Sequence, residues 1–463
     1  SISLEQLSAQ MRRGEQVPLR HTMQVVLTLS IPSILQQIVV TAMEYIDAAM
    51  VGHIGASATA SIGIVSSSTW LLHGMLAGLY MSFSIQVAQY LGADRQEDAR
   101  GVLRQSMIFN LAVGCAAAAF GIGISRFLPG WLGADAALQA NASAYFAIWS
   151  ASLPFAMAMG TYSSMLRSSG DALTPGLISV LVCALDVVFN TLLIFPTGTI
   201  RLGALSLPGA GLGTAGAALG TGLAELAVGL YLLYFVLRRC PALRLEKGER
   251  LHLDRTQLRM VLRIAAPVAS EKVILSTAQI VSTAIVAPLG TVAIAANSFA
   301  VTAESLCYMP AYGIQSAAAM LVGQSVGAGR RRMARRLGWV TVLLGIVVMV
   351  VTGGLLYAFA PQMMAILTPD SDIIALGTRV LRIEAFAEAM YGASIVAGGV
   401  FQGAGSTLVP TLFNLGMFVE KTAEGKALQR ADLPQTAADW PRRRPPGLCP
   451  GPAKPLRAAG HRT

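Results

Sequence analysis

Acidic residues within long apolar stretches are the groups in this sequence best suited to chemistry. Glu44 and Asp47 lie three residues apart, so a helix would place both carboxyl groups on one face. Asp186 and Asn190 are one helical turn apart in a later apolar stretch. Ionisable groups at membrane depth are costly, and they mark ion or substrate pathways. These four residues therefore indicate a site that handles protons, cations or both.

More carboxylates of this kind follow along the chain. They are Glu225, Glu271, Glu304, Glu384 and Glu388. Burial in an apolar medium favours the protonated form of a carboxylic acid, which lets the group carry a proton, whereas the ionised form attracts Na⁺ or a cationic substrate. Because the two states exclude each other, such a group can couple ion entry to substrate release. The alternative is that some of these carboxylates lie at helix ends and face water.

Composition and apolar runs identify the elements that must hold these residues. Only 13% of the residues are charged and 54% are hydrophobic, which is too little charge for a soluble surface. Stretches of about 20 apolar residues, the length that crosses a bilayer, recur along the chain. We expect helices over residues 24–50, 63–90, 105–125, 143–165, 176–195, 213–237, 260–287, 298–323, 338–360 and 380–402. The sequence therefore predicts an all-α, multi-pass membrane protein.

Basic residues gather in alternate connections between these expected helices. Arginines are frequent before the first helix and in segments 95–104, 238–263 and 330–336, whereas the opposite connections hold few. Basic connections stay on the cytoplasmic side of a membrane, so we expect a cytoplasmic N-terminus. The formal charge of +10 thus reflects topology, and we expect no nucleic-acid partner.

The chain repeats itself with an offset of 235 residues. Pro32 corresponds to Pro267, and Val87–Arg95 corresponds to Val322–Arg330. Six helices per copy is an even number, so both copies would insert with the same orientation. This arrangement is a parallel repeat of two six-helix lobes, which is typical of transporters.

The repeat sets the expected domain boundaries. We predict an N-terminal segment, a first lobe, a basic linker, a second lobe and a polar tail at residues 1–21, 22–238, 239–259, 260–419 and 420–463. The last two helices of the second lobe are expected from about residue 410 onward, but the sequence after Val419 is rich in proline and arginine. Such sequence is typical of disorder. We interpret the tail as a replacement of helices eleven and twelve, for example by a frameshift near Met417; the alternative is a basic regulatory tail.

Three motifs resemble those of a known family. They are Asp47–Gly52 in the first expected helix, Leu166–Asp171 after the fourth, and Met309–Gly329 in the eighth. From about Pro32 to Gly416 the chain resembles the multidrug and toxic compound extrusion (MATE) transporters. The resemblance implies two six-helix lobes around a cavity and an exporter that exchanges H⁺ or Na⁺ for organic cations.

The resemblance also implies roles for individual residues. Asp47 matches the aspartate that binds the coupling ion, Pro32 the proline at which the first helix bends, and Thr221 a polar position of the same site. Asp186 and Asn190 occupy the positions of a family pair whose order is reversed here. In the second lobe, Glu271 and Glu304 resemble acidic cavity residues, and Glu388 lies near another one. We place Glu44 with these three as cavity residues.

The resulting hypothesis is a cation-coupled antiporter of a bacterial inner membrane. We expect organic cations or drugs as substrates, lipid around a monomer, no cofactor, and no metal other than Na⁺ at Asp47. The residues leave H⁺ and Na⁺ open as coupling ion. One alternative is a flippase for lipid-linked polymers, although that would require a basic cavity; another is an inactive product that lacks its last helices. No nucleophile–base pair or cofactor motif indicates an enzyme.

Overall fold

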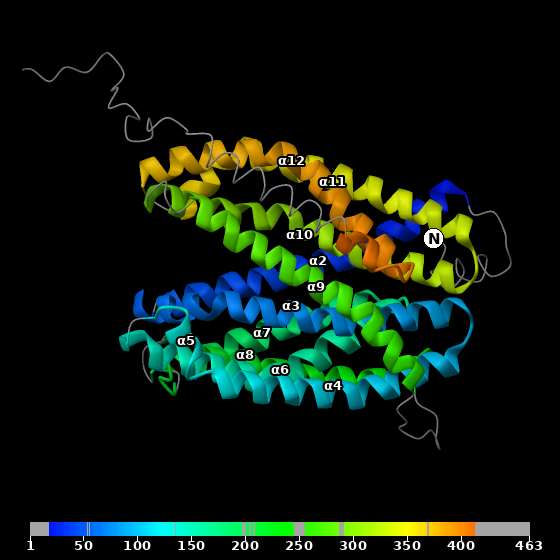
Figure 1. The fold of residues 1–463 in the computed structure, drawn as a ribbon, viewed down its shortest axis with the longest axis horizontal. Coiled ribbons are helices and arrows are strands. Elements are labelled where there is room, and N and C mark those ends of the chain that lie inside the picture. The colour runs from blue at the N-terminus through cyan, green and yellow to red at the C-terminus, as the bar shows by residue number, and fades with distance from the viewer. Residues whose placement is uncertain are drawn as a thin grey trace, which may run out of the picture. The chain divides into compact units, whose positions relative to one another are not determined.

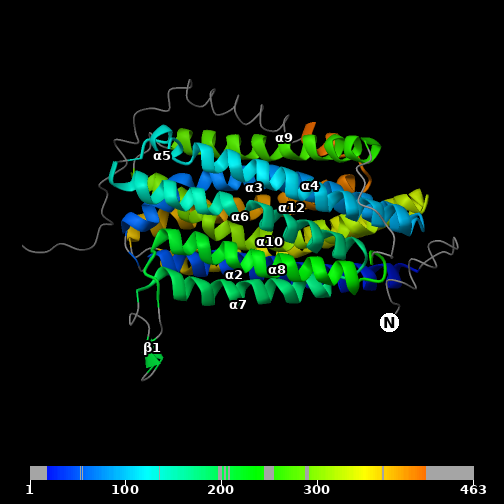
Figure 2. The same cartoon turned by 90° about the horizontal axis from the view of Figure 1, so that it is seen from below.

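Long helices joined by short turns make up the described part of the chain (Figure 1). The computed structural model describes residues 18–52, 54, 56–134, 136–196, 201–202, 205–206, 209–244, 255–286, 291–367 and 370–412. In the first half, the helices are α2 (Leu19–Gly52), α3 (Ala56–Gly92), α4 (Gln96–Ile124), α5 (Leu128–Trp131), α6 (Ala136–Ser168), α7 (Leu173–Ile194) and α8 (Thr214–Arg238). In the second half they are α9 (Arg255–Val286), α10 (Thr291–Gly327), α11 (Arg331–Leu367) and α12 (Ser371–Gly403). Two short strands, β1 (Arg201–Leu202) and β2 (Leu205–Ser206), pair antiparallel between α7 and α8 (Figure 2).

Each of the ten predicted membrane segments coincides with one long helix. Seven of the described helices are long and apolar enough to cross a membrane, namely α2, α3, α4, α6, α7, α8 and α11. The other three, α9, α10 and α12, form as helices but are not among those seven. In α12 the charged residues Asp372, Arg379 and Arg382 occupy the first half of the helix. The prediction of an all-α membrane protein is confirmed.

Helix ends at two pairs of positions share an unusual backbone conformation. Asp94 after α3 and Gly329 after α10 have φ values of 62° and 71°. Gly170 after α6 and Gly405 after α12 have φ values of 99° and 80°. A left-handed residue is a common way to end a helix, and aspartate tolerates it better than most side chains. The members of each pair are 235 residues apart, which equals the offset of the predicted repeat.

The first half is held together around α6 and α8. These two helices pack against each other, and α6 also packs against α3 and α4 (Figure 1). The largest core cluster brings together Phe83, Leu103, Leu166 and Leu232, each with 0% of its surface exposed. Complete removal of such side chains from water or lipid allows close dispersion contacts, which fix the relative position of the helices that carry the candidate site.

The second half is organised around α10. This helix packs against α11 and α12, which also contact each other. Two clusters of buried side chains fill the space among the three helices, one around Leu356 and Leu381 and another around Ile314 and Val396. Figure 1 shows these helices on the side of α3 opposite α4 and α6.

Helices α2 and α3 link the two halves. Helix α2 contacts α7 in its own half and α10 in the other, while α3 contacts α9 and α10. Glycines permit two of these crossings. A Cβ atom on Gly78 of α3 would lie 3.0 Å from the carbonyl oxygen of Ala265 on α9, and one on Gly313 of α10 would lie 2.6 Å from the nitrogen of Ile34 on α2. The described residues belong to a single compact unit that ends at Val419. The lobe boundaries remain predictions, and the predicted tail and helices eleven and twelve from residue 413 onward lie outside the described residues.

Candidate functional site

Asn190 joins the two aspartates that the sequence singled out. Its Nδ2 donates a hydrogen bond to Asp47 Oδ1 at 2.9 Å and another to Asp186 Oδ2 at 3.0 Å. Asp186 and Asn190 lie one turn apart on α7, and Asp47 lies on α2, which packs against α7. Helical spacing and the contact between two helices therefore bring three of the predicted ion-coupling residues into one cluster, which we call the Asp47 cluster (Asp47, Asp186 and Asn190).

The Asp47 cluster contains buried acceptors that no protein group satisfies. Asp186 and Asn190 each have 0% of their surface exposed. Asp186 Oδ1 and Asn190 Oδ1 have no hydrogen-bond partner in the structure. Gly220 on α8 makes room for this arrangement, because a Cβ atom there would overlap Asn190 Oδ1. Buried polar atoms are normally satisfied, so unsatisfied acceptors beside two carboxyl groups suit a cation.

Two further polar groups lie near this cluster. Glu225 on α8 and Tyr145 on α6 are both close enough to Asp186 for electrostatic interaction. Thr221, which the resemblance assigned to the ion site, hydrogen-bonds through Oγ1 to the carbonyl oxygen of Ala217 at 3.2 Å in its own helix. The described contacts do not join Thr221 to either aspartate. Of the two α8 residues, Glu225 is therefore better supported than Thr221 as a neighbour of the Asp47 cluster.

Pro32 lies within α2, as the hinge hypothesis requires. A proline inside a helix removes the hydrogen bond to the carbonyl four residues earlier, which makes bending easier at that point. On α7 the neighbour of Pro32 is Gly176, where a Cβ atom would lie 3.6 Å from the proline carbonyl oxygen. The hinge itself remains a prediction.

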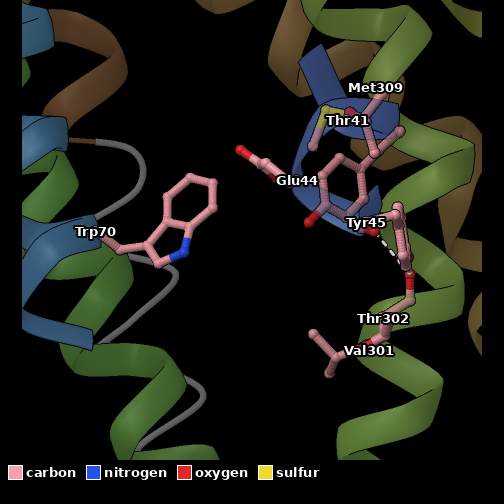
Figure 3. A pocket seen from close by; sticks show the side chains of 9 residues that line it. Thr41, Glu44, Tyr45, Trp70, Val301, Thr302 and Met309 are labelled. Atoms are coloured by element: carbon pink, nitrogen blue, oxygen red, sulfur yellow. Dashed lines mark hydrogen bonds between the residues drawn. The ribbon is translucent and has the colours of Figure 1, made fainter. Parts of the chain in front are cut away.

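A pocket of about 340 Å³ lies between α2, α3 and α10 (Figure 3). Its lining combines one carboxylate with aromatic, hydroxyl and apolar side chains: Thr41, Glu44, Tyr45, Trp70, Val301, Thr302, Ser305, Tyr308 and Met309. Among these lining residues there is no basic side chain. A pocket of this size accommodates a small organic molecule, and its only formal charge is the carboxylate of Glu44.

The aromatic residues of the pocket are held by specific contacts. Tyr45 donates a hydrogen bond from its hydroxyl to the carbonyl oxygen of Thr302 at 3.0 Å, which joins α2 to α10. Tyr308 packs edge-to-face against Tyr312 and Tyr391, with ring centroids 5.9 and 5.7 Å away. In Figure 3, Glu44 points into the space between Trp70 and the α10 side of the pocket. Aromatic faces attract cations, so this lining favours a positively charged ligand.

Sequence reasoning assigned Glu44 to a cavity, but it missed the aromatic residues around it. Tyr45, Trp70 and Tyr308 lie in ordinary apolar helices, where aromatic side chains usually pack against neighbours. The only available signal was that Tyr45 adjoins Glu44 in the sequence.

The second-half acids gather in part. Glu388 lies close enough to Glu304 and Glu384 for electrostatic interaction. It has 1% of its surface exposed, and neither of its carboxylate oxygens has a hydrogen-bond partner. Tyr308 lies within electrostatic range of Glu304, Glu388 and also Glu44, so it connects this group with the pocket. The described contacts do not place Glu271 in this group.

Arg167 is a partly buried cation in the last turn of α6. Its guanidinium group donates to Gln36 Oε1 at 2.8 Å, to Ser164 Oγ at 2.8 Å and to Ser163 Oγ at 3.3 Å. The bond to Gln36 ties the end of α6 to α2. Arg167 thus stabilises the position of α2, the helix that carries Asp47.

Comparisons with known proteins agree with this architecture. Relatives include a Thermotoga maritima protein named "Probable multidrug resistance protein NorM", which is 25% identical over 83% of this chain and 80% of its own length. Another is the multidrug resistance protein NorM of Vibrio vulnificus, with 24% identity over 81% of this chain and 80% of its own length.

Solved structures share the fold. A transporter of the MOP superfamily from Pyrococcus furiosus, described as having a binding pocket of reverse polarity, has a TM-score of 0.82 at 20% identity over 92% of this chain and 91% of its own. A multidrug resistance MATE transporter in an outward-facing conformation has a TM-score of 0.79 at 20% identity over 88% and 87%. The MatE family profile matches residues 32–192 and 267–420, more than half of the sequence. With two profile-matched segments and ten long helices among its described residues, this chain belongs to the MatE family of MATE transporters.

Proposed function

We propose that this MATE transporter exports hydrophobic organic cations in exchange for H⁺ or Na⁺ across a bacterial inner membrane. The observation that carries the proposal is the bridging of Asp47 and Asp186 by one amide nitrogen, with two buried acceptors left unsatisfied. The names of the relatives support drugs as the exported class.

The Asp47 cluster suits a single cation. Two carboxylates that share one amide donor repel each other when both are ionised, and the low-dielectric surroundings strengthen that repulsion. A proton or Na⁺ bound between them relieves it. The site is therefore most stable with one cation present, and its release requires a change in the surroundings, which is the requirement for coupling.

The pocket suits the exported substrate. Glu44 supplies a negative charge, while Tyr45, Trp70 and Tyr308 supply flat apolar surfaces with negative faces. Glu44 lies three residues before Asp47 on α2, so one helix carries both the pocket carboxylate and the coupling carboxylate. Bending of α2 near Pro32 would move both groups together, so that ion binding at Asp47 releases the substrate from the pocket.

The second-half acids provide a further cation-binding element of the same pathway. Like Asp186, Glu388 has a buried carboxylate oxygen without a hydrogen-bond partner, and it lies near two other glutamates. Its connection to the pocket through Tyr308 supports a role in the same transport cycle. The arginine-rich connections support a cytoplasmic N-terminus.

Ethidium efflux tests the proposal. Cells that lack their own efflux pumps would express this chain or the Asp47→Asn variant, and dye loss would be followed under an imposed H⁺ or Na⁺ gradient. We expect gradient-dependent efflux with the unchanged chain and none with Asp47→Asn, because asparagine cannot carry the coupling charge. The ion whose gradient drives efflux is the coupling ion.

A matched variant controls for the removal of an acid as such. Asp372 is an exposed aspartate in the first turn of α12, so Asp372→Asn should retain efflux. Membrane fractions should contain equal amounts of all three proteins. Equal efflux by Asp47→Asn and the unchanged chain would refute the assignment of Asp47.

A further inference from the structure

Two glutamines form reciprocal hydrogen bonds between the halves of the molecule. Gln89 near the end of α3 donates from Nε2 to the carbonyl oxygen of Gly403, the last residue of α12, at 3.1 Å. Gln324 near the end of α10 donates from Nε2 to the carbonyl oxygen of Ser168, the last residue of α6, at 2.8 Å. The two donors are 235 residues apart and so are the two acceptors. Each bond is therefore the counterpart of the other.

Glycines bring the backbones of α3 and α10 together at the same place. A Cβ atom on Gly92 would overlap the carbonyl group of Gln324, and one on Gly327 would overlap the carbonyl group of Gln89. These two contacts are also counterparts under the 235-residue shift. The crossing of α3 and α10 is thus tight only because both positions lack a side chain.

This junction lies far from the pocket along the same two helices. Gln89 is 19 residues beyond Trp70 on α3, and Gln324 is 15 residues beyond Met309 on α10. At about 1.5 Å of rise per residue, the separations along the helices are roughly 28 and 22 Å. The turns that follow, at residues 93–95 and 328–330, lead into the arginine-rich segments. The junction therefore closes the bundle at its arginine-rich end, and the pocket lies several helical turns away along α3 and α10.

We propose that Gln89 and Gln324 are the two latches of a gate at the arginine-rich end, and that both must release before a substrate reaches the pocket from that side. The proposal rests on the transport function argued above and assigns working residues outside the ion and substrate sites. The structure is then the state in which this gate is closed. The two bonds connect α3 to α12 and α10 to α6, so neither half moves away while either latch remains engaged.

The chemistry of the latches suits repeated opening. Both acceptors are buried main-chain carbonyls and both donors are neutral amides, so release exposes no charge. A neutral hydrogen bond of this kind shifts an equilibrium by about three- to tenfold. Loss of one latch should increase the open population by that factor, and loss of both by roughly 10- to 100-fold.

Labelling of a cysteine in the pocket measures the open population. Ser305 lines the pocket, and Ser305→Cys would be made in a variant whose native cysteines at positions 115, 183, 240, 307 and 449 are replaced. A membrane-impermeant maleimide would be applied to vesicles from the arginine-rich side only. We expect slow labelling with both glutamines present, faster labelling in Gln89→Ala and in Gln324→Ala by similar factors, and the fastest labelling in the double variant.

An exposed glutamine supplies the matched control. Gln96 is the first residue of α4 and is exposed, so Gln96→Ala should leave the labelling rate unchanged. Labelling from the opposite side should fall as labelling from the arginine-rich side rises, which a general loss of structure would not produce. A double variant that labels at the original rate on both sides would overturn the gate.

A reversible cross-link between α3 and α10 holds the gate closed, so it tests whether the gate must open for transport. Ala88 and Gly323 face each other across the crossing, where the Cβ atom of Ala88 lies 3.0 Å from the position of a Cβ on Gly323. Disulfides need about 3.5–4.5 Å, so a small separation of the helices suffices for Ala88→Cys and Gly323→Cys to join. We expect oxidation to stop ethidium efflux and a reducing agent to restore it. Efflux that continues in fully cross-linked protein would overturn the proposal.

The two proposals fail in different ways. If the unchanged chain shows no gradient-driven efflux, the transport function is refuted, while the labelling rates still report the gate. If the chain transports but neither the glutamine variants nor the cross-link alters accessibility, the gate is refuted and the transport function stands.

Discussion

Replacement of Glu44 by glutamine should weaken the binding of cationic substrates. Glu44 carries the only formal charge among the residues that line the pocket. Glu44→Gln removes that charge and preserves the size and planarity of the side chain. The expected loss is therefore electrostatic, and the aromatic and hydroxyl contacts of the pocket stay in place.

The pocket volume sets the magnitude. A sphere of 340 Å³ has a radius of about 4.3 Å, so a cation near the centre lies roughly 4–5 Å from the lining carboxylate. At about 4.5 Å the attraction is about 3.7 kcal/mol for an effective dielectric constant near 20 and about 0.9 kcal/mol for that of water. Since Glu44 is exposed on one side and borders the pocket on the other, the two values bracket the effect. The dissociation constant for a monovalent cation should rise about 5- to 500-fold.

Ethidium binding to the purified transporter measures this change. The fluorescence of the dye would be titrated against the unchanged chain, Glu44→Gln and Glu44→Asp at low and at high salt. Glu44→Asp keeps the charge and should lose less than about fivefold. The difference between Glu44→Gln and the unchanged chain should shrink at high salt, because salt screens a partly exposed charge.

An exposed acid gives the comparison for net charge. Glu97 lies in the first turn of α4, and Glu97→Gln should bind ethidium as the unchanged chain does. An affinity within twofold of the original for Glu44→Gln at low salt would show that the pocket does not recognise charge through this residue.

Three other substitutions test the packing around the sites. Gly220→Ala should abolish efflux because the added methyl group displaces Asn190. Gly354→Ala should retain efflux, because Gly354 has open space around it. Normal transport by Gly220→Ala would contradict the role of the Asp47 cluster. Arg167→Met should lower the thermal midpoint in detergent through the loss of three hydrogen bonds, about 2–4 kcal/mol, and an unchanged midpoint would show that these bonds contribute nothing. Asp370→Ala should cost about 1 kcal/mol, because Asp370 Oδ1 accepts from two backbone nitrogens at the start of α12; the same midpoint measurement decides it.

The helices were predictable because apolar runs of membrane length carry a strong signal. All ten predicted segments coincide with helices, although several helices extend further, as α11 does from Arg331 to Leu367. Their polar ends continue the helix beyond the apolar core, and hydropathy does not register them. The four-residue helix α5 and the strands β1 and β2 were missed because segments of four and two residues have no readable periodicity.

The site was predictable where its residues share a helix. Asp186 and Asn190 are one turn apart, so their joint orientation toward Asp47 followed from helical geometry and the family resemblance. The pocket was not predictable, because Trp70 and Tyr308 come from α3 and α10 and meet only through packing between helices. Gln89 and Gln324 were visible as matching positions of the sequence repeat. Their hydrogen-bond acceptors, the carbonyl groups of Gly403 and Ser168, depend on helix packing and could not be predicted from the sequence.

The paired glutamine bonds have the contact pattern of a twofold homodimer. In such a dimer, a residue of one subunit binds a partner in the other, and the same pair recurs with the subunits exchanged. Gln89 with Gly403 and Gln324 with Ser168 obey that rule within one polypeptide. A single half-length ancestor that assembled as a pair would have obtained both bonds from one glutamine codon. Gene fusion would then have preserved the contacts while each half changed separately, so the two halves would come to hold different side chains around the same pair of bonds.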